Sequence, residues 1–124
     1  MQSLLFVFLG GGLGSVVRYT IGRWINSAHT YNFPFGTLAA NVLACVTLGL
    51  LIGLADHRQL LSPNARLFWA VGFCGGFSTF STFSQETLTL FQNGLNTSAI
   101  SYITISLFFC VGATYLGILA GEQI

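Results

Sequence analysis

The residues best suited to chemistry lie between Gly72 and Phe83, where a glycine pair precedes alternating hydroxyl and phenyl side chains in an apolar stretch. A helix in lipid must satisfy its own backbone hydrogen bonds. A break is therefore tolerated only where protein buries it or where it lines a polar cavity. Gly75 and Gly76 predict such a break at mid-membrane, and broken membrane helices point to ion or solute sites.

The two ends of the predicted break favour ions of opposite charge. A helix that ends near Gly75 leaves carbonyl oxygens free, and a helix that restarts after Ser78 or Thr79 leaves N–H groups free. If two copies of the chain meet here, the carbonyls of Gly75 and Ser78 would form an all-oxygen cage for a hard monovalent cation. The alternative is that Gly75 and Gly76 only permit close helix crossing.

Phe80 and Phe83 are three residues apart, so they share one face of the restarted helix, with the hydroxyl of Ser81 between them. The edge of a phenyl ring is positive, and it can touch an anion without trapping it as a lysine or arginine would. Phenylalanines at this spacing are more often simple packing residues. The interleaved hydroxyls favour the anion contact here.

Two further segments carry polar side chains at intervals of four residues, which places them on one helical face. Near the C-terminus these are Tyr102, Ser106, Cys110 and Thr114, and in the second segment they are Thr37 and Asn41. The Asn41 amide has two N–H donors for an anion, with an interhelical hydrogen bond as the alternative. For each hydroxyl of the C-terminal track, the alternative is a bond to its own helix.

The composition shows what must position these residues. Of 124 residues, 53% are hydrophobic and 6% are charged, which indicates a membrane protein rather than a soluble domain. Four apolar segments predict a single all-α domain, residues 1–124, of four transmembrane helices in the lipid bilayer. Their approximate ranges are 4–24, 35–54, 66–91 and 98–120. No room remains for a soluble catalytic domain, so an enzyme is not expected, and there is no basic patch for nucleic acid.

Each segment also contains a pair of glycines four residues apart, which predicts close packing of helix backbones. The pairs are Gly10 with Gly14, Gly49 with Gly53, Gly72 with Gly76, and Gly117 with Gly121. The three cysteines lie in different segments without ligand spacing, so we expect free thiols rather than a zinc or redox site.

The arginines predict how the chain inserts. With four crossings, Arg58 and Arg66 lie on one side, and we expect Arg23 and Arg18 on the other. This balance gives no positive-inside bias, so copies of opposite orientation can pair as an antiparallel, dual-topology homodimer. We expect structural roles for Arg18, as a pairing or interfacial residue, and for Glu86, near a pore mouth.

Three ordered motifs, Gly11–Tyr19, Phe33–Asn41 and Gly72–Phe83, resemble those of the Fluc (CrcB) fluoride channels of the bacterial inner membrane. The resemblance implies an antiparallel dimer with two fluoride pores and passive fluoride export down its electrochemical gradient. It implies a central structural sodium ion (Na+) held by the carbonyls of Gly75 and Ser78. The implied fluoride contacts are Asn41, Phe80, Phe83, Ser81, Thr37, Tyr102, Ser106 and Thr114. Ser78 replaces the usual threonine, and Cys110 replaces the usual serine of the track, where a thiol is the poorer donor.

Two other functions remain open on the residues alone. A proton-coupled exporter of the small multidrug type would have the same size and helix number, but it needs a membrane-embedded carboxylate. Glu86 is the one candidate. A non-transporting membrane assembly subunit would use the glycine pairs and Asn41 only for packing.

Overall fold

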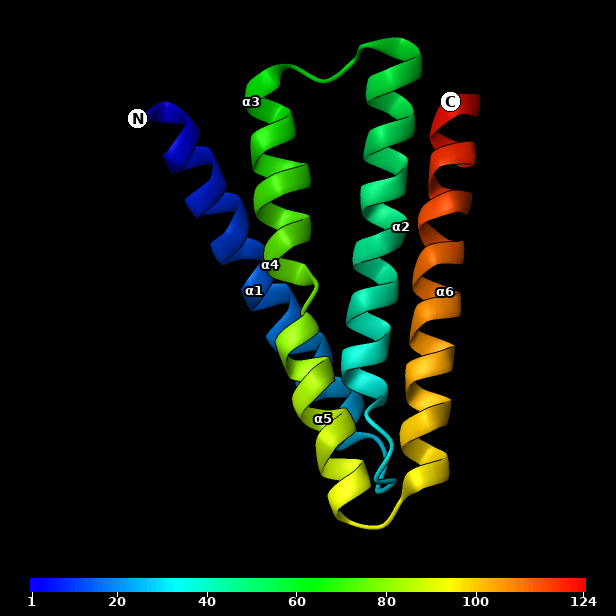
Figure 1. Ribbon diagram of the computed structural model, residues 1–124. Helices are drawn as coiled ribbons and strands as arrows, with labels where there is room; N and C mark the ends of the chain where they lie inside the picture. Colours follow the sequence, from blue (N-terminus) through cyan, green and yellow to red (C-terminus); the bar gives the residue numbers. More distant parts are fainter.

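The computed structural model describes all 124 residues, and the chain is helical with no strands (Figure 1). Three helices are long and apolar enough to cross a membrane: α1 (Gln2–Ser27), α2 (Phe35–Arg58) and α6 (Asn96–Gln123). They contain the first, second and fourth predicted segments. The all-α membrane architecture is therefore confirmed.

The third predicted segment is a broken rod. Its first part joins α3 (Pro63–Arg66), the π-helical η1 (Leu67–Cys74) and α4 (Gly75–Phe77), and its second part is α5 (Phe80–Gln92). The two parts meet about halfway along the bundle, beside α1 and α2 (Figure 1). Neither part alone is long enough to cross a bilayer.

The predicted end of the first half-helix, near Gly75, is wrong by two residues, whereas the predicted restart after Ser78 or Thr79 is confirmed. The helix continues through both glycines to Phe77, and the extended residues are Ser78 and Thr79. Gly76 instead packs against the backbone of Gly11, where a Cβ atom would collide. Close crossing, the alternative that the sequence left open, therefore describes Gly76.

The chain ends and the α2–α3 connection lie at one end of the bundle, and the α1–α2 and α5–α6 connections lie at the other (Figure 1). This is the up-and-down order that four crossings require. The closest helix pairs are α2 with α6 and α1 with the η1–α4 rod.

The predicted glycine pairs build both of these contacts. A Cβ atom on Gly10 or Gly14 would collide with the backbone of Phe68 or Phe73, and Gly72 faces the backbone of Val7. Across the other pair, Gly49 and Gly53 face the carbonyls of Thr114 and Ile118, and Gly117 and Gly121 face those of Val46 and Leu50. All four glycine pairs therefore bring helix backbones into contact, as predicted.

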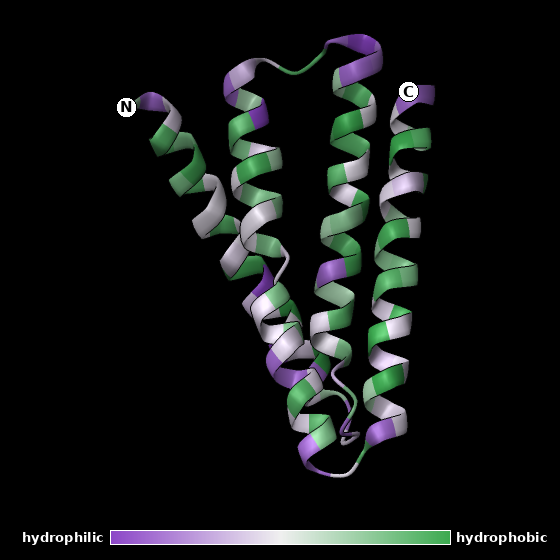
Figure 2. Ribbon diagram, viewed as in Figure 1, coloured by the Kyte–Doolittle hydropathy of each residue, from purple (hydrophilic) through white to green (hydrophobic).

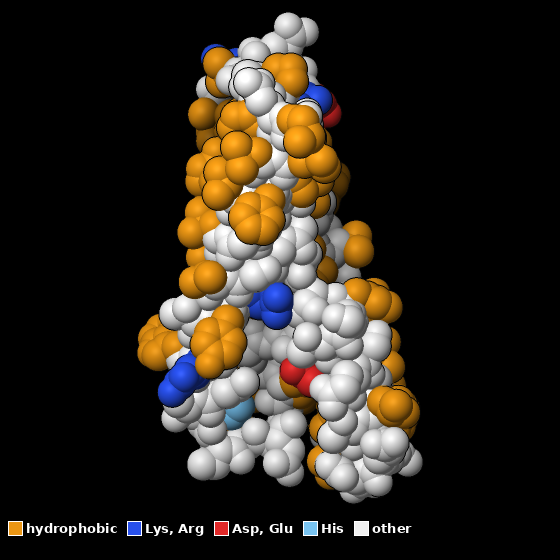
Figure 3. All heavy atoms as spheres, turned by 90° about the vertical axis from the view of Figure 1, so that its left-hand side faces the viewer, with side chains coloured by type: hydrophobic (Ala, Val, Ile, Leu, Met, Phe, Trp, Pro, Cys, Tyr) orange, Lys and Arg blue, Asp and Glu red, His pale blue; other side chains and the backbone are white.

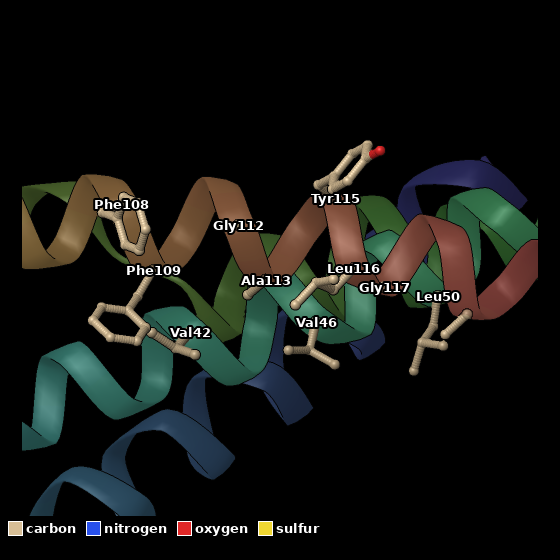
Figure 4. A pocket seen from close by; sticks show the side chains of 11 residues that line it. Val42, Val46, Leu50, Phe108, Phe109, Gly112, Ala113, Tyr115, Leu116 and Gly117 are labelled. Carbon is tan, nitrogen blue, oxygen red and sulfur yellow. The ribbon is translucent and has the colours of Figure 1, made fainter.

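Most residues along the helices are hydrophobic, and hydrophilic residues lie mainly at the connections and in the half that holds α5 (Figure 2). The largest cavity, about 640 Å³, is an open groove along α2 and α6 (Figure 4). Val42, Val46, Phe108 and Leu116 line it, and Tyr115 turns its hydroxyl away. This groove offers an ion almost no polar group, so the candidate site lies elsewhere.

Arg18 lies beside the break, in the half of the bundle that holds the α1–α2 connection, as expected. Its Nε donates to the carbonyl oxygen of Gly76 at 3.0 Å. The expected pairing role of Arg18 is therefore confirmed, while dual insertion stays a prediction.

Candidate functional site at the broken helix

The break begins where Ser78 leaves the helix. Ser78 has extended backbone angles, and both its N–H and its Oγ donate to the carbonyl of Cys74 at 3.0 Å. Thr79 is also extended, and its Oγ1 accepts from the N–H of Thr82 at 3.2 Å as the N-cap of α5. Hydroxyl side chains thus end one helix and start the next, because they satisfy backbone groups that a break exposes.

Asn41 holds the break from α2. Its Nδ2 donates to the carbonyl of Thr79 at 3.1 Å, and its Oδ1 accepts from the N–H of Thr79 at 2.7 Å. The amide therefore pairs with an extended residue as a neighbouring β-strand would. This is the interhelical bond that the sequence left open. One N–H of the amide still has no acceptor, so Asn41 keeps a donor for an anion.

Two predicted cation ligands carry free carbonyl groups. The carbonyl of Gly76 accepts from Arg18, whereas those of Gly75 and Ser78 accept no hydrogen bond. Gly75 is exposed, and a Cβ atom there would meet nothing within 4 Å. Carbonyls at the end of a helix carry partial negative charge, so these two oxygens suit a cation approaching from outside the chain.

Phe80 and Phe83 lie together on α5, with ring centroids 5.4 Å apart and planes tilted by 41°. Both line an open cavity of about 230 Å³, as do Asn41, Thr79 and Ser106. The cavity therefore combines phenyl rings with amide and hydroxyl groups from α2, α5 and α6. Phe80 is 74% exposed.

The four polar residues of the α6 track do not share one environment. Tyr102 and Ser106 are buried, and the Ser106 Oγ has no hydrogen-bond partner. Cys110 lines the same cavity as Ser106. The Oγ1 of Thr114 donates to the carbonyl of Cys110 at 3.0 Å, within its own helix, and Thr114 is not part of the cavity wall. A buried hydroxyl without a partner is costly, so Ser106 is a natural ligand for an ion.

Glu86, for which we expected a structural role near a pore mouth, has partners that the sequence did not reveal. Its Oε1 accepts from the Oγ1 of Thr37 at 2.7 Å, and its Oε2 accepts from the hydroxyl of Tyr102 at 2.9 Å. This carboxylate therefore joins α2, α5 and α6 through two residues that we predicted as ion contacts. Its position one turn beyond Phe83 indicated a place near the candidate pore. The sequence could not identify its two partners, because they are 49 and 16 residues away.

The half of the molecule below the break is hollowed, with basic, acidic and histidine side chains around the hollow (Figure 3). A cavity of about 250 Å³ there is lined by Arg18, Arg23, Thr37, Thr79 and Glu86, among others. Because Thr79 borders both this cavity and the one beside Phe80, polar groups continue from the bundle end to the break. The Oγ of Ser81 lies 3.3 Å from the Oγ1 of Thr79, at the junction.

Comparison with known proteins agrees with an ion site at the break. Residues 5–118 match the family described as CrcB-like protein, Camphor Resistance (CrcB). A relative from Phocaeicola vulgatus, named fluoride-specific ion channel FluC, is 44% identical over 98% of this chain and 100% of its own length. Relatives of the same name from Flavobacterium psychrophilum and Acidobacterium capsulatum are 36% and 42% identical, and each comparison covers at least 96% of both chains.

Proposed function

Because the chain belongs to the CrcB family, a family of bacterial multi-pass membrane channels and not of enzymes, we propose that it is a fluoride-selective channel. It would let cytoplasmic fluoride leave passively, down its electrochemical gradient. The observation that carries the proposal is the cavity at the break, where Asn41, Ser106, Phe80 and Phe83 face one space.

These groups suit a small, strongly hydrated anion. Fluoride enters a pore only if hydrogen-bond donors replace its water, and the free N–H of Asn41 and the unpartnered hydroxyl of Ser106 are such donors. The edges of Phe80 and Phe83 add weak positive charge without a salt bridge that would hold the ion. A series of weak contacts along the path lets the ion move on, whereas a single tight site would hold it.

We propose that the functional unit is an antiparallel homodimer with two pores. In a single chain the cavity beside Phe80 is open on one side and the ring is 74% exposed, so a second copy would close the wall. The half-helix ends would then meet. Labelling of cysteines introduced at Ser62 and Asn93 tests this arrangement, because each site would be reached from both sides of the membrane. Labelling of each site from one side only would contradict dual topology.

A structural sodium ion fits the free carbonyls of Gly75 and Ser78, one pair from each copy. When bound, the ion would supply positive charge that holds two half-helix ends together. Replacement of Na+ by a large organic cation during purification should lower the thermal stability of the dimer. An unchanged melting temperature would argue against the site.

The experiment that tests conduction is ion efflux from liposomes containing the purified protein, measured with fluoride and chloride electrodes. We expect fluoride efflux, essentially no chloride efflux, and loss of fluoride efflux in Phe80→Ile. Phe108→Ile is a matched control, because Phe108 is also 74% exposed but lies in the apolar groove (Figure 4). Equal chloride efflux would refute selectivity, and no flux of either ion would favour an assembly subunit.

A pH gradient across the same liposomes distinguishes a proton-coupled exporter. Such an exporter needs a carboxylate that takes up and releases protons, yet both oxygens of Glu86 accept hydroxyl hydrogen bonds here. We therefore expect fluoride efflux without any requirement for a proton gradient.

A further inference from the structure

Two cysteines that are far apart in sequence lie level with each other on neighbouring helices. The helices α2 and α6 run parallel, because Gly49 faces Thr114 and Gly53 faces Ile118. Cys45 is one turn before Gly49, and Cys110 is one turn before Thr114. The register therefore places the two residues side by side.

This thiol pair faces the candidate ion path. Cys45 and Cys110 are only partly buried and both line the cavity of about 230 Å³ beside Phe80 and Ser106. Cys74, the third cysteine, is buried and is not part of that wall. All three are free thiols, so the pair is available for ligands.

The composition of the pair limits which ligand fits. No group of three or more His, Cys, Asp or Glu side chains is arranged to hold a metal ion, so a closed tetrahedral zinc site cannot form. Two sulfur ligands suffice for soft ions that accept linear coordination, such as Cu+, Ag+ and Hg2+. We propose that Cys45 and Cys110 form a binding site for one two-coordinate, thiophilic metal ion beside the pore.

Hg2+ binds to the two thiols by ligand exchange. Supplied as neutral HgCl2, which can enter an apolar medium, mercury exchanges two Hg–Cl bonds for two Hg–S bonds. Each thiol loses its proton, and two chloride ions and two protons leave to water. The product, a mercury bis-thiolate, is uncharged. A neutral product avoids the large cost of placing a charge in a water-poor site.

Mercury content after exposure to HgCl2 and removal of loosely held metal with a modest excess of a monothiol tests the site. We expect about one retained Hg2+ per chain, as in other chelates whose second bond forms at high effective concentration. Cys110→Ser and Cys45→Ser should each lose this ion, whereas Cys74→Ser should keep it. Retention by Cys110→Ser, or loss in Cys74→Ser, would overturn the assignment. If Cys45→Ser does not fold, Cys110→Ser alone decides.

A second measurement asks what the bound metal does, and this part rests on the proposed function. In fluoride efflux assays, HgCl2 should slow wild-type protein and Cys74→Ser at least tenfold, and it should leave the efflux rate of Cys110→Ser unchanged relative to its own untreated rate. Mercury retention without any fluoride efflux in untreated protein would refute the channel but not the site. Efflux that is insensitive to retained mercury would refute the position beside the pore.

Discussion

The two halves of the α2–α6 helix pair differ in the residues that lie at their contact. Toward the chain ends, Gly49 and Gly53 meet Gly117 and Gly121, and the backbones touch. Toward the break, the same helices carry Asn41 and Ser106, and a cavity lies beside them. At the glycine contacts the helix backbones touch, and the groove beside them is lined by apolar side chains. Toward the break the cavity lining includes the Asn41 amide and the Ser106 hydroxyl, which keep donors free. The residue at each turn therefore decides whether the space beside the helices is apolar or polar.

The same contrast divides the third segment. Its first part packs on α1 through Gly72 and Gly76, while its second part is held through side-chain hydrogen bonds to Thr79 and Glu86. Helix association in lipid has no hydrophobic driving force, so close contact must supply the stability. Changes in the glycine half should then affect folding, whereas changes in the polar half should also affect function.

Asn41→Asp should have the largest effect, because a carboxylate would face the carbonyl of Thr79 and lose the donor that the amide provides. An uncompensated charge at this site is expected to cost about 3–5 kcal/mol in unfolding free energy and to abolish fluoride efflux. Unfolding in denaturing detergent and electrode-detected efflux measure the two effects. Asn64→Asp, at an exposed position of α3, is the control and should resemble wild type. Normal efflux in Asn41→Asp would contradict the role of Asn41 in holding the break.

Gly14→Ala should destabilise the protein by about 3 kcal/mol, since its Cβ atom would collide with the backbone of Phe73 and Phe77. Gly12→Ala on the same helix meets nothing within 4 Å and should be neutral, or stabilising by up to about 1 kcal/mol through helix propensity. The difference between the two variants in thermal unfolding measures the glycine contact alone. Equal stability of the two variants would show that the glycine contacts do not stabilise the fold.

Glu86→Gln should lower stability by about 1.5–3 kcal/mol, because the hydroxyls of Thr37 and Tyr102 lose a charged acceptor. The neighbouring Gln85→Ala removes only an exposed hydrogen bond to Thr89 and should have little effect. Thermal unfolding of the two variants checks this. A stability loss no larger than that of Gln85→Ala would show that Glu86 does not join the three helices.

Ser106→Ala should have the smallest effect on folding, within about 0.5 kcal/mol, because the hydroxyl has no partner to lose. On the proposed function it should still slow fluoride efflux several-fold. Thr104→Ala, an exposed hydroxyl bound to its own helix, is the control and should change neither quantity. A marked loss of stability in Ser106→Ala would mean that the hydroxyl serves packing.

Local pattern alone was enough to predict much of this protein. Apolar length set the positions of the helices, and intervals of four residues set the glycine pairs, because lipid and helix geometry act on each segment separately. The spacing of Phe80 and Phe83 placed their rings together for the same reason. The roles of the predicted fluoride and sodium ligands remain predictions.

What only the tertiary structure decided were the partners across helices. The sequence contains Asn41, Thr79 and Glu86, but it does not say that Asn41 pairs with the backbone of Thr79 or that Glu86 joins Thr37 to Tyr102. Nor does it show that Gly76 packs against α1 or that the first half-helix continues to Phe77. Spacing along one helix fixes which side chains share a face. Which face meets which depends on the register between helices, and that is set by the glycine contacts acting together.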